Sequence, residues 1–172
     1  DYALKTICQF PQIFWHMFEN NELTQAQPRP YYREQLTRVL ADKTTDFLWT
    51  QAIRQYRQQA MLRWVYRDVN GLCSLEELTD ELSAFAEASI DAAIACAEVP
   101  LIARHGQPIG EESQQPQQMV VIGMGKFGAQ ELNLSSDIDL IFSYPEAGET
   151  TGRAVISNQE FFIKLGQSII RL

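Results

Sequence analysis

Apolar side chains recur at helical spacing through the first part of the chain. The clearest case runs from Asp46 to Val69, where apolar residues return every three or four positions and so share one helix face. The members of this stripe are Trp49, Ile53, Tyr56, Ala60 and Trp64. Asp46 is a suitable N-cap and Asn70-Gly71 a suitable stop. Residues 46–69 are therefore predicted to form one long helix.

Four arginines lie off this stripe and predict that the other face of the helix is exposed to solvent. They are Arg54, Arg57, Arg63 and Arg67. A charged face of this kind is usually solvated. The alternative interpretation is a surface for an acidic partner protein or a neighbouring domain.

Helical signals continue on both sides of this segment. Residues 1–19 are predicted to be helical with a break at Pro11. The sequence Ser74-x-x-Glu77 is a capping box, which begins another helix. Its apolar period continues to about residues 97–103, so this helix is also expected to be long.

The pattern changes after residue 104. Residues 105–118 are polar and rich in Gln, Glu and Pro, a composition that predicts a connector. The helical region therefore covers residues 1–104, and a different unit is expected to begin at residue 119. After a predicted loop at 145–153, Ser157-x-x-Glu160 forms a second capping box and begins a last helix.

Two short apolar runs flank a glycine-rich turn in the second unit. Val120-Val121-Ile122 leads into Gly123-Met124-Gly125-Lys126-Phe127-Gly128, and a polar piece then leads to a second apolar run. This order predicts strand, glycine turn, short helix and strand. Because strand side chains alternate between two faces, Asp137 and Asp139 would share one face of the second strand. The other face, which suits a core, would hold Ile138, Leu140 and Phe142.

The expected fold class is α+β, with an N-terminal helical region followed by the start of a sheet backed by helices. A length of 172 residues suggests one domain, or one and a half. The chain does not begin with Met and ends within an apolar-periodic stretch. We therefore expect it to be an excised piece of a longer protein.

Composition narrows the classes of function. A net charge of −8 and a pI near 4.7 argue against a nucleic-acid backbone as the main partner, since such binders usually carry a basic surface. Cys8, Cys73 and Cys96 are odd in number and form no C-x-x-C, so neither a disulfide framework nor a zinc site is indicated. No apolar run approaches the roughly 20 residues of a membrane span, and we expect no signal peptide. The cytoplasm is the expected location.

The aspartate pair and the glycines together predict a site for phosphate and metal. Adjacent carboxylates such as Asp137 and Asp139 repel each other unless a cation lies between them, and Mg²⁺ prefers such oxygen ligands. Protein-bound Mg²⁺ usually contacts substrate phosphates as well. Glycines let backbone N–H groups approach a phosphate closely, and Lys126 adds a positive charge.

Two other interpretations of the glycine turn are weaker. Gly123-x-Gly125-x-x-Gly128 fits the dinucleotide-binding fingerprint. That fingerprint needs a full helix next and an acidic residue about 20 positions on, whereas Asn133 interrupts the helix early and the acids come too soon. A strand pair with a tight turn and a solvated aspartate pair is the remaining, non-functional interpretation.

These residues resemble the nucleotidyltransferases related to polymerase β. Within them, Gly123–Gly128, Glu131-Leu132-Asn133 and Ser135–Phe142 are similar to the signature of the glutamine synthetase adenylyltransferase/adenylyl-removing enzymes. Asn133 and Ile138, with the downstream residues Phe161-Phe162 and Leu165-Gly166-Gln167, resemble the N-terminal, adenylyl-removing half. The specific match covers about residues 119–172. Uridylyltransferases that modify the PII signal protein carry a similar core.

The resemblance implies that residues 119–172 are an incomplete polymerase β-like nucleotidyltransferase core. It implies catalytic and Mg²⁺-binding roles for Asp137 and Asp139. It also implies that the nucleotide phosphates are bound by Gly123, Gly125, Lys126, Gly128 and Ser136. Lys126 is a weaker member of this set because it could instead pair with Glu131. ATP, ADP and phosphate are the implied substrates or products.

The implied reaction is phosphorolysis, in which phosphate attacks AMP carried on a tyrosine of glutamine synthetase and releases ADP. The partner half of the full-length enzyme would adenylylate with ATP, and together they would control nitrogen assimilation. Adenylylated glutamine synthetase and the PII signal protein are the implied partners, with no nucleic acid or membrane.

Enzymes of this family use a third carboxylate from a later strand, in a stretch similar to Val-Asp-x-Arg-Leu-Arg-Pro. No such stretch is present before Leu172. The fragment alone is therefore expected to bind Mg-nucleotide weakly and to turn over poorly. Two alternatives stay open, namely a uridylyltransferase-like or other polymerase β-like nucleotidyltransferase and a non-enzymatic helical interaction module.

Overall fold

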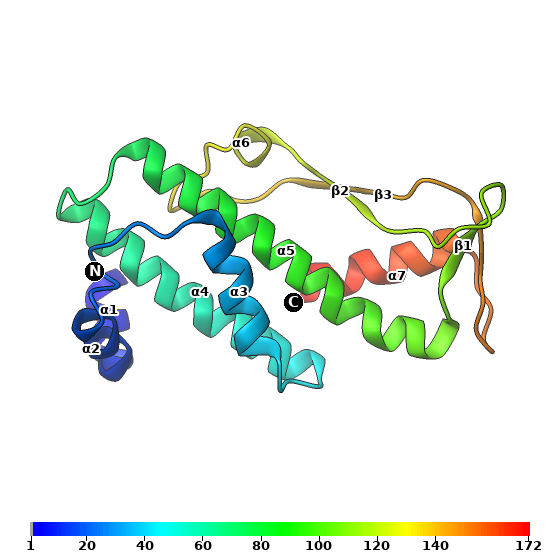
Figure 1. The fold of residues 1–172 in the computed structure, drawn as a ribbon, viewed down its shortest axis with the longest axis horizontal. Coiled ribbons are helices and arrows are strands. Elements are labelled where there is room, and N and C mark those ends of the chain that lie inside the picture. The colour runs from blue at the N-terminus through cyan, green and yellow to red at the C-terminus, as the bar shows by residue number, and fades with distance from the viewer. Residues whose placement is uncertain (1) are drawn as a thin grey trace. The chain divides into compact units, whose positions relative to one another are not determined.

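The computed structural model describes residues 2–172 as a series of helices with four short strands (Figure 1). In chain order the elements are α1 (Tyr2–Gln9), α2 (Pro11–Glu19), α3 (Arg29–Leu40), α4 (Asp46–Val69), α5 (Leu75–His105), β1 (Pro108–Gly110), β2 (Val120–Gly123), α6 (Gly125–Gly128), β3 (Leu140–Ser143), β4 (Gly148–Thr150) and α7 (Asn158–Arg171). The strands form two antiparallel pairs, β1 with β4 and β2 with β3. The predicted α+β class is confirmed.

The chain divides into two compact units. Unit 1 contains the residues up to Ser89 together with Ala129–Asp137, and unit 2 contains Ile90–Gly128 together with Ile138–Leu172. The long helix α5 contributes its first half to unit 1 and its second half to unit 2. The expected division into residues 1–104, 105–118 and 119–172 stays a prediction.

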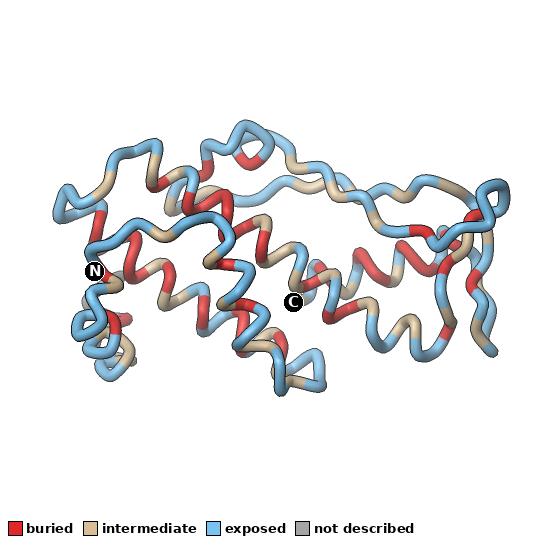
Figure 2. Tube along the Cα trace, viewed as in Figure 1, coloured by how far each residue is buried: buried red, intermediate tan, exposed pale blue. Residues whose placement is uncertain are grey.

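The core of unit 1 is built on the predicted stripe of α4. Every member of that stripe is buried, and buried positions recur along α4 and the first half of α5 (Figure 2). Tyr32 of α3, Trp64 of α4 and Phe85 of α5 meet with ring centroids 5.4–5.9 Å apart. The helix bounds are as predicted, but the N-cap is Thr45, whose hydroxyl accepts a hydrogen bond from the Leu48 N–H at 3.4 Å.

The predicted solvent-exposed arginine face of α4 is wrong for two of its four members. Arg54 and Arg57 are exposed, whereas Arg63 and Arg67 are 4% and 2% exposed. Both buried guanidinium groups contact the carboxylate of Glu81 on α5, which is itself only 2% exposed. Arg67 also pairs with Glu77, so the two guanidinium charges face two carboxylates, which offset the cost of removing those charges from water.

Glu81 is the centre of a buried polar network. Its carboxylate accepts hydrogen bonds from Arg63, from Arg67 at 2.7 Å and from the hydroxyl of Tyr32. It also accepts from the indole N–H of Trp64 at 2.9 Å and from the backbone N–H of Gln27 at 3.1 Å. A single carboxylate thus connects α3, α4, α5 and the loop before α3.

Unit 2 has its own core beneath α7. The helix begins as predicted, with the Ser157 hydroxyl accepting a hydrogen bond from the Glu160 N–H at 3.2 Å. The apolar face of α7 packs against the second half of α5 in a cluster of Ala93, Ala97, Phe161, Phe162, Leu165 and Ile169. Phe142 of β3 and Met119 lie against this cluster. The β2–β3 pair therefore contacts the helices of unit 2 through Phe142.

The connector and the loop expected at 145–153 each contain a strand. Residues Pro108–Gly110 pair with Gly148–Thr150, and Asn158 donates hydrogen bonds to the carbonyls of Ile109 and Glu146 at 2.9 and 3.2 Å. Such three-residue strands carry too few positions for an alternating apolar pattern, which is why the sequence indicated loops.

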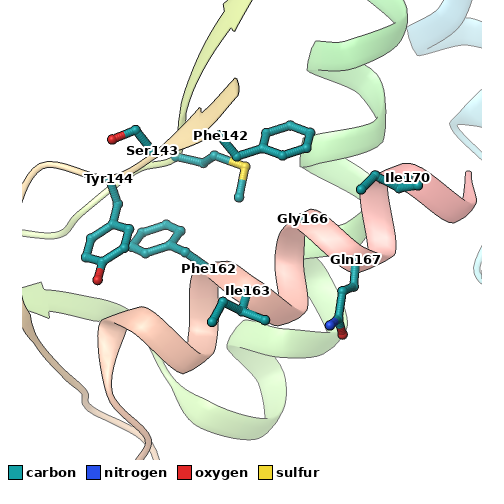
Figure 3. Close-up of a pocket in the computed structure, with 9 residues that line it drawn as sticks. Phe142, Ser143, Tyr144, Phe162, Ile163, Gly166, Gln167 and Ile170 are labelled. Atoms are coloured by element: carbon teal, nitrogen blue, oxygen red, sulfur yellow. The ribbon is translucent and has the colours of Figure 1, made fainter. Parts of the chain in front are cut away.

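An apolar groove lies between β3 and α7. It has a volume of about 280 Å³. Figure 3 shows Phe142 and Tyr144 on the strand side, with Ile163, Gly166 and Ile170 on the helix side. Tyr144 stacks on Phe162, which also lines the groove, with ring centroids 5.0 Å apart. No helix within residues 2–172 is long and apolar enough to cross a lipid bilayer.

Two glycines of unit 2 are expected to respond oppositely to alanine. At Gly106, where φ is +79°, a Cβ would lie 2.2 Å from the backbone N of Gly152. Gly106→Ala should therefore lower the free energy of unfolding by roughly 2–3 kcal/mol. At Gly166 in α7 the nearest atom to a Cβ is 3.6 Å away, so Gly166→Ala should raise it by about 0.5–1 kcal/mol through helix propensity.

Hydrogen exchange of the α7 amides against urea concentration measures both effects within unit 2. Wild-type protein is the reference, and the two variants are each other's control because the added group is identical. Equal stability changes in both variants would contradict the role given to the close backbone approach at Gly106.

Candidate functional site

The glycine turn follows β2 directly and is hydrogen-bonded to the residue that precedes β3. The order strand, turn, short helix and strand is as predicted, and α6 is only four residues long. The backbone N–H of Met124 donates to the carbonyl of Asp139 at 2.9 Å, and the N–H of Gly128 donates to the carbonyl of Met124 at 3.0 Å. The turn and the residue before β3 are therefore joined by a backbone hydrogen bond.

At each glycine of the turn, a different feature of the local geometry explains why the residue has no side chain. A Cβ on Gly123 would lie 2.6 Å from the ring of Phe127, and one on Gly128 would lie 2.5 Å from the carbonyl oxygen of Gly123. Gly125 has φ +53°, and a Cβ there would lie 3.5 Å from the Oδ2 atom of Asp139. The missing side chain at Gly125 thus leaves the carboxylate of Asp139 directly beside bare backbone.

The sequence predicted that both aspartates lie in the second strand, and this prediction is wrong. β3 begins at Leu140, so Asp137 and Asp139 lie in the segment leading into it, and both are exposed. Ile138, expected on the core face, is 42% exposed. The core-facing position is correct for Phe142, which lies against the α7 cluster. The polar run before Leu140 has no partner strand beside it, because β2 ends at Gly123, opposite Leu140.

Asp137 directly follows a tightly hydrogen-bonded turn in unit 1. The Ser136 N–H donates to the Asn133 carbonyl at 3.1 Å, and the Ser136 hydroxyl accepts from the Asn133 N–H at 3.0 Å. The N–H and the hydroxyl of Ser135 both donate to the Asn133 side-chain oxygen at 3.1 Å. Ser136, predicted to bind phosphate, is thus part of the turn that precedes Asp137, and its phosphate role stays a prediction.

Both aspartates are exposed. Asp137 and Asp139 carry carboxylate oxygens, the ligand type that Mg²⁺ prefers, and their metal-binding role stays a prediction. Lys126 is exposed on α6, and its alternative pairing with Glu131 stays a prediction. Among residues 2–172, the structure holds no group of three or more His, Cys, Asp or Glu side chains arranged for a metal ion.

Antiparallel pairing removes the dinucleotide interpretation. β2 and β3 run antiparallel with Val121 opposite Phe142, and only the short α6 and a loop join them. The dinucleotide fingerprint requires a full helix that crosses over to a parallel strand. The glycine turn therefore belongs to a different kind of site.

Comparison with known proteins decides the family. The whole chain, residues 1–172, matches the family model described as glutamate-ammonia ligase adenylyltransferase. The chain belongs to this adenylyltransferase family.

The relatives of this chain within the adenylyltransferase family are much longer than the chain itself. The protein from Acinetobacter baylyi is 51% identical over 133 residues, which are 77% of this chain and 14% of the relative. Those from Nitrosococcus oceani and Pseudomonas aeruginosa are each 40% identical, covering 100% and 99% of this chain and 18% of the relative. Each is named bifunctional glutamine synthetase adenylyltransferase/adenylyl-removing enzyme. The chain thus spans less than a fifth of these relatives, and the predicted family is confirmed.

Sequence reasoning missed the residues of the chain that hold the segment before the aspartates. Leu132 is buried in unit 1, and Gln130 has φ +60° and hydrogen bonds to Arg29 and Glu87. An isolated leucine and glutamine in a polar stretch give no local signal for such contacts.

Proposed function

We propose that residues 1–172 form the N-terminal part of an adenylyl-removing nucleotidyltransferase, which takes AMP off a tyrosine of glutamine synthetase by phosphorolysis. The observation that carries this proposal is the carboxylate of Asp139 beside the bare backbone of Gly125, in a chain of the adenylyltransferase family. A carboxylate beside backbone that no side chain covers suits a phosphate bound together with a cation.

In the proposed reaction an oxygen of inorganic phosphate bonds to the phosphorus of the AMP group. The bond from that phosphorus to the tyrosine oxygen breaks, and the tyrosine oxygen takes up a proton. The products are ADP and unmodified tyrosine. Asp137 and Asp139 would hold Mg²⁺, which supplies positive charge to the phosphoryl oxygens when bound. Backbone N–H groups of residues 125–127 and the charge of Lys126 would orient the phosphate groups, while the Gly128 N–H already donates to the Met124 carbonyl.

The test uses a polypeptide of the relatives' length that contains this region, here called the long protein. It is mixed with adenylylated glutamine synthetase, Mg²⁺ and phosphate, and the released nucleotide is identified by chromatography. We expect ADP, with no release when phosphate is omitted. Release of AMP without phosphate would indicate hydrolysis and contradict the phosphorolysis proposal.

Other outcomes separate the alternatives. Transfer of a uridylyl group to the PII signal protein, with no activity towards glutamine synthetase, would favour a uridylyltransferase. Absence of any nucleotide release from the folded long protein would favour a non-enzymatic helical module. PII as a regulatory partner, a third carboxylate from outside residues 1–172 and a cytoplasmic location all stay predictions.

A further inference from the structure

The segment that carries Asp137 is packed into the helical unit rather than into the strand unit. Ala129–Asp137 belongs to unit 1, although the residues before and after it belong to unit 2. Leu132 anchors this segment, since its side chain is only 4% exposed among otherwise exposed or half-buried neighbours. Burial of one leucine side chain restrains the segment but does not orient it, because apolar contacts are non-directional.

Directional contacts come from Arg29. Its guanidinium group donates to the side-chain oxygen of Gln130 at 3.1 Å and to the carboxylate of Glu87 at 2.7 Å. The side-chain nitrogen of Gln130 donates to the other oxygen of Glu87 at 3.0 Å. Arg29 also pairs with Asp80. The three side chains of Arg29, Glu87 and Gln130 form a closed ring of hydrogen bonds around the start of the segment.

The position of Arg29 is unfavourable for helix stability alone. It is the first residue of α3, where the helix macrodipole disfavours a positive charge. Its pairs are about half exposed, and exposed ion pairs contribute little to stability. The planar fork of arginine can engage a carboxylate and an amide in fixed directions. The contacts of Arg29 therefore serve to orient the segment Ala129–Asp137 rather than to stabilise the helix.

A rigid turn transmits this anchoring to Asp137. From Leu132 the chain enters the turn in which Ser135 and Ser136 make four hydrogen bonds with Asn133. Asp137 follows immediately. The path from Arg29 to Asp137 therefore consists of a hydrogen-bonded ring, one buried leucine and one closed turn.

We propose that Arg29 is a positioning residue, which holds Asp137 in place through Gln130 in the ring it forms with Glu87. The inference rests on the proposed function only for the role of Asp137; the anchoring itself is independent of it. Gln130→Ala breaks the same ring, so the double variant with Arg29→Ala should behave like either single variant, as expected for residues acting as one unit.

Hydrogen exchange of residues 129–137 in the long protein tests the anchoring. Arg29→Ala should speed exchange of these amides about tenfold, and Arg29→Lys should give an intermediate value because lysine keeps the charge but lacks the planar fork. Arg54→Ala is the control, since Arg54 is an exposed arginine on α4 of the same unit. Exchange in Arg29→Ala no faster than in Arg54→Ala would overturn the inference.

The ADP-release assay then tests the consequence for activity. Arg29→Ala should lower kcat about tenfold with little change in KM for adenylylated glutamine synthetase, and Arg29→Lys should recover part of the loss. Faster exchange with unchanged kcat would overturn the positioning role. If wild type releases no ADP while exchange responds as expected, the proposed function fails and the anchoring stands.

Discussion

Replacing Glu81 with glutamine is expected to lower the free energy of unfolding of unit 1 by about 3–5 kcal/mol. The substitution keeps the shape of the side chain but removes its charge. Arg63, almost fully buried, would lose the carboxylate that it contacts, and Arg67, also buried, would keep only the carboxylate of Glu77. A buried charge left without its partner costs far more than the pair contributes when intact. Since the free energy of unfolding of a whole domain is only about 5–15 kcal/mol, this loss is large.

Tryptophan fluorescence during urea denaturation measures this effect in unit 1 alone. The chain has three tryptophans, Trp15, Trp49 and Trp64, and all lie in that unit. Glu76→Gln is the matched control, because Glu76 is an exposed glutamate on the same helix and should change stability by less than about 0.5 kcal/mol. A loss below about 1 kcal/mol for Glu81→Gln would mean that the two arginines find other partners or water.

Replacing Asp137 and Asp139 together with asparagine is expected to lower ADP release by the long protein at least about 1,000-fold. The variant keeps side-chain size and one side-chain oxygen at each position but removes both negative charges. A thousandfold loss corresponds to about 4 kcal/mol of transition-state stabilisation, a reasonable value for loss of metal-assisted charge stabilisation. Both residues are exposed, so the substitution should leave the fold intact.

Rates are measured under saturating phosphate and Mg²⁺, with circular dichroism to verify folding. Glu111→Gln and Glu112→Gln together form the control, because they remove two exposed carboxylates from unit 2 away from the glycine turn. Release unaffected by the aspartate substitutions would place the removing chemistry at another site. A loss equal to that of the control variant would remove the metal-binding role.

Local signals predicted the helices well. The bounds of α4 at Asp46 and Val69 and the caps at Ser74 and Ser157 follow from a few neighbouring residues. Each of these signals acts within one helical turn, so the sequence contains it in full. The glycine turn and its short helix were predictable for the same reason.

Contacts between distant segments were not predictable. Periodicity indicates which residues share a face but not what covers that face, so Arg63 and Arg67 read as solvated although Glu81 lies 18 and 14 positions further on. The start of β3 was placed too early because alternation of Asp and Ile continues before Leu140, while the partner strand does not. The link from Arg29 to Gln130 spans 101 positions and leaves no local pattern.

Unit 1 cannot be completed in the order in which the chain is synthesised. Its helices are made by residue 89, but the segment with Leu132 emerges only after β2 and the glycine turn. In a nascent chain this segment is therefore missing from unit 1 for about 40 residues of synthesis, which at 5–20 residues per second lasts roughly 2–8 s. Packing of the segment into unit 1 joins residues far apart in sequence and is expected to be a late step of folding. The segment that carries Asp137 is thus expected to be the last part of unit 1 to fold.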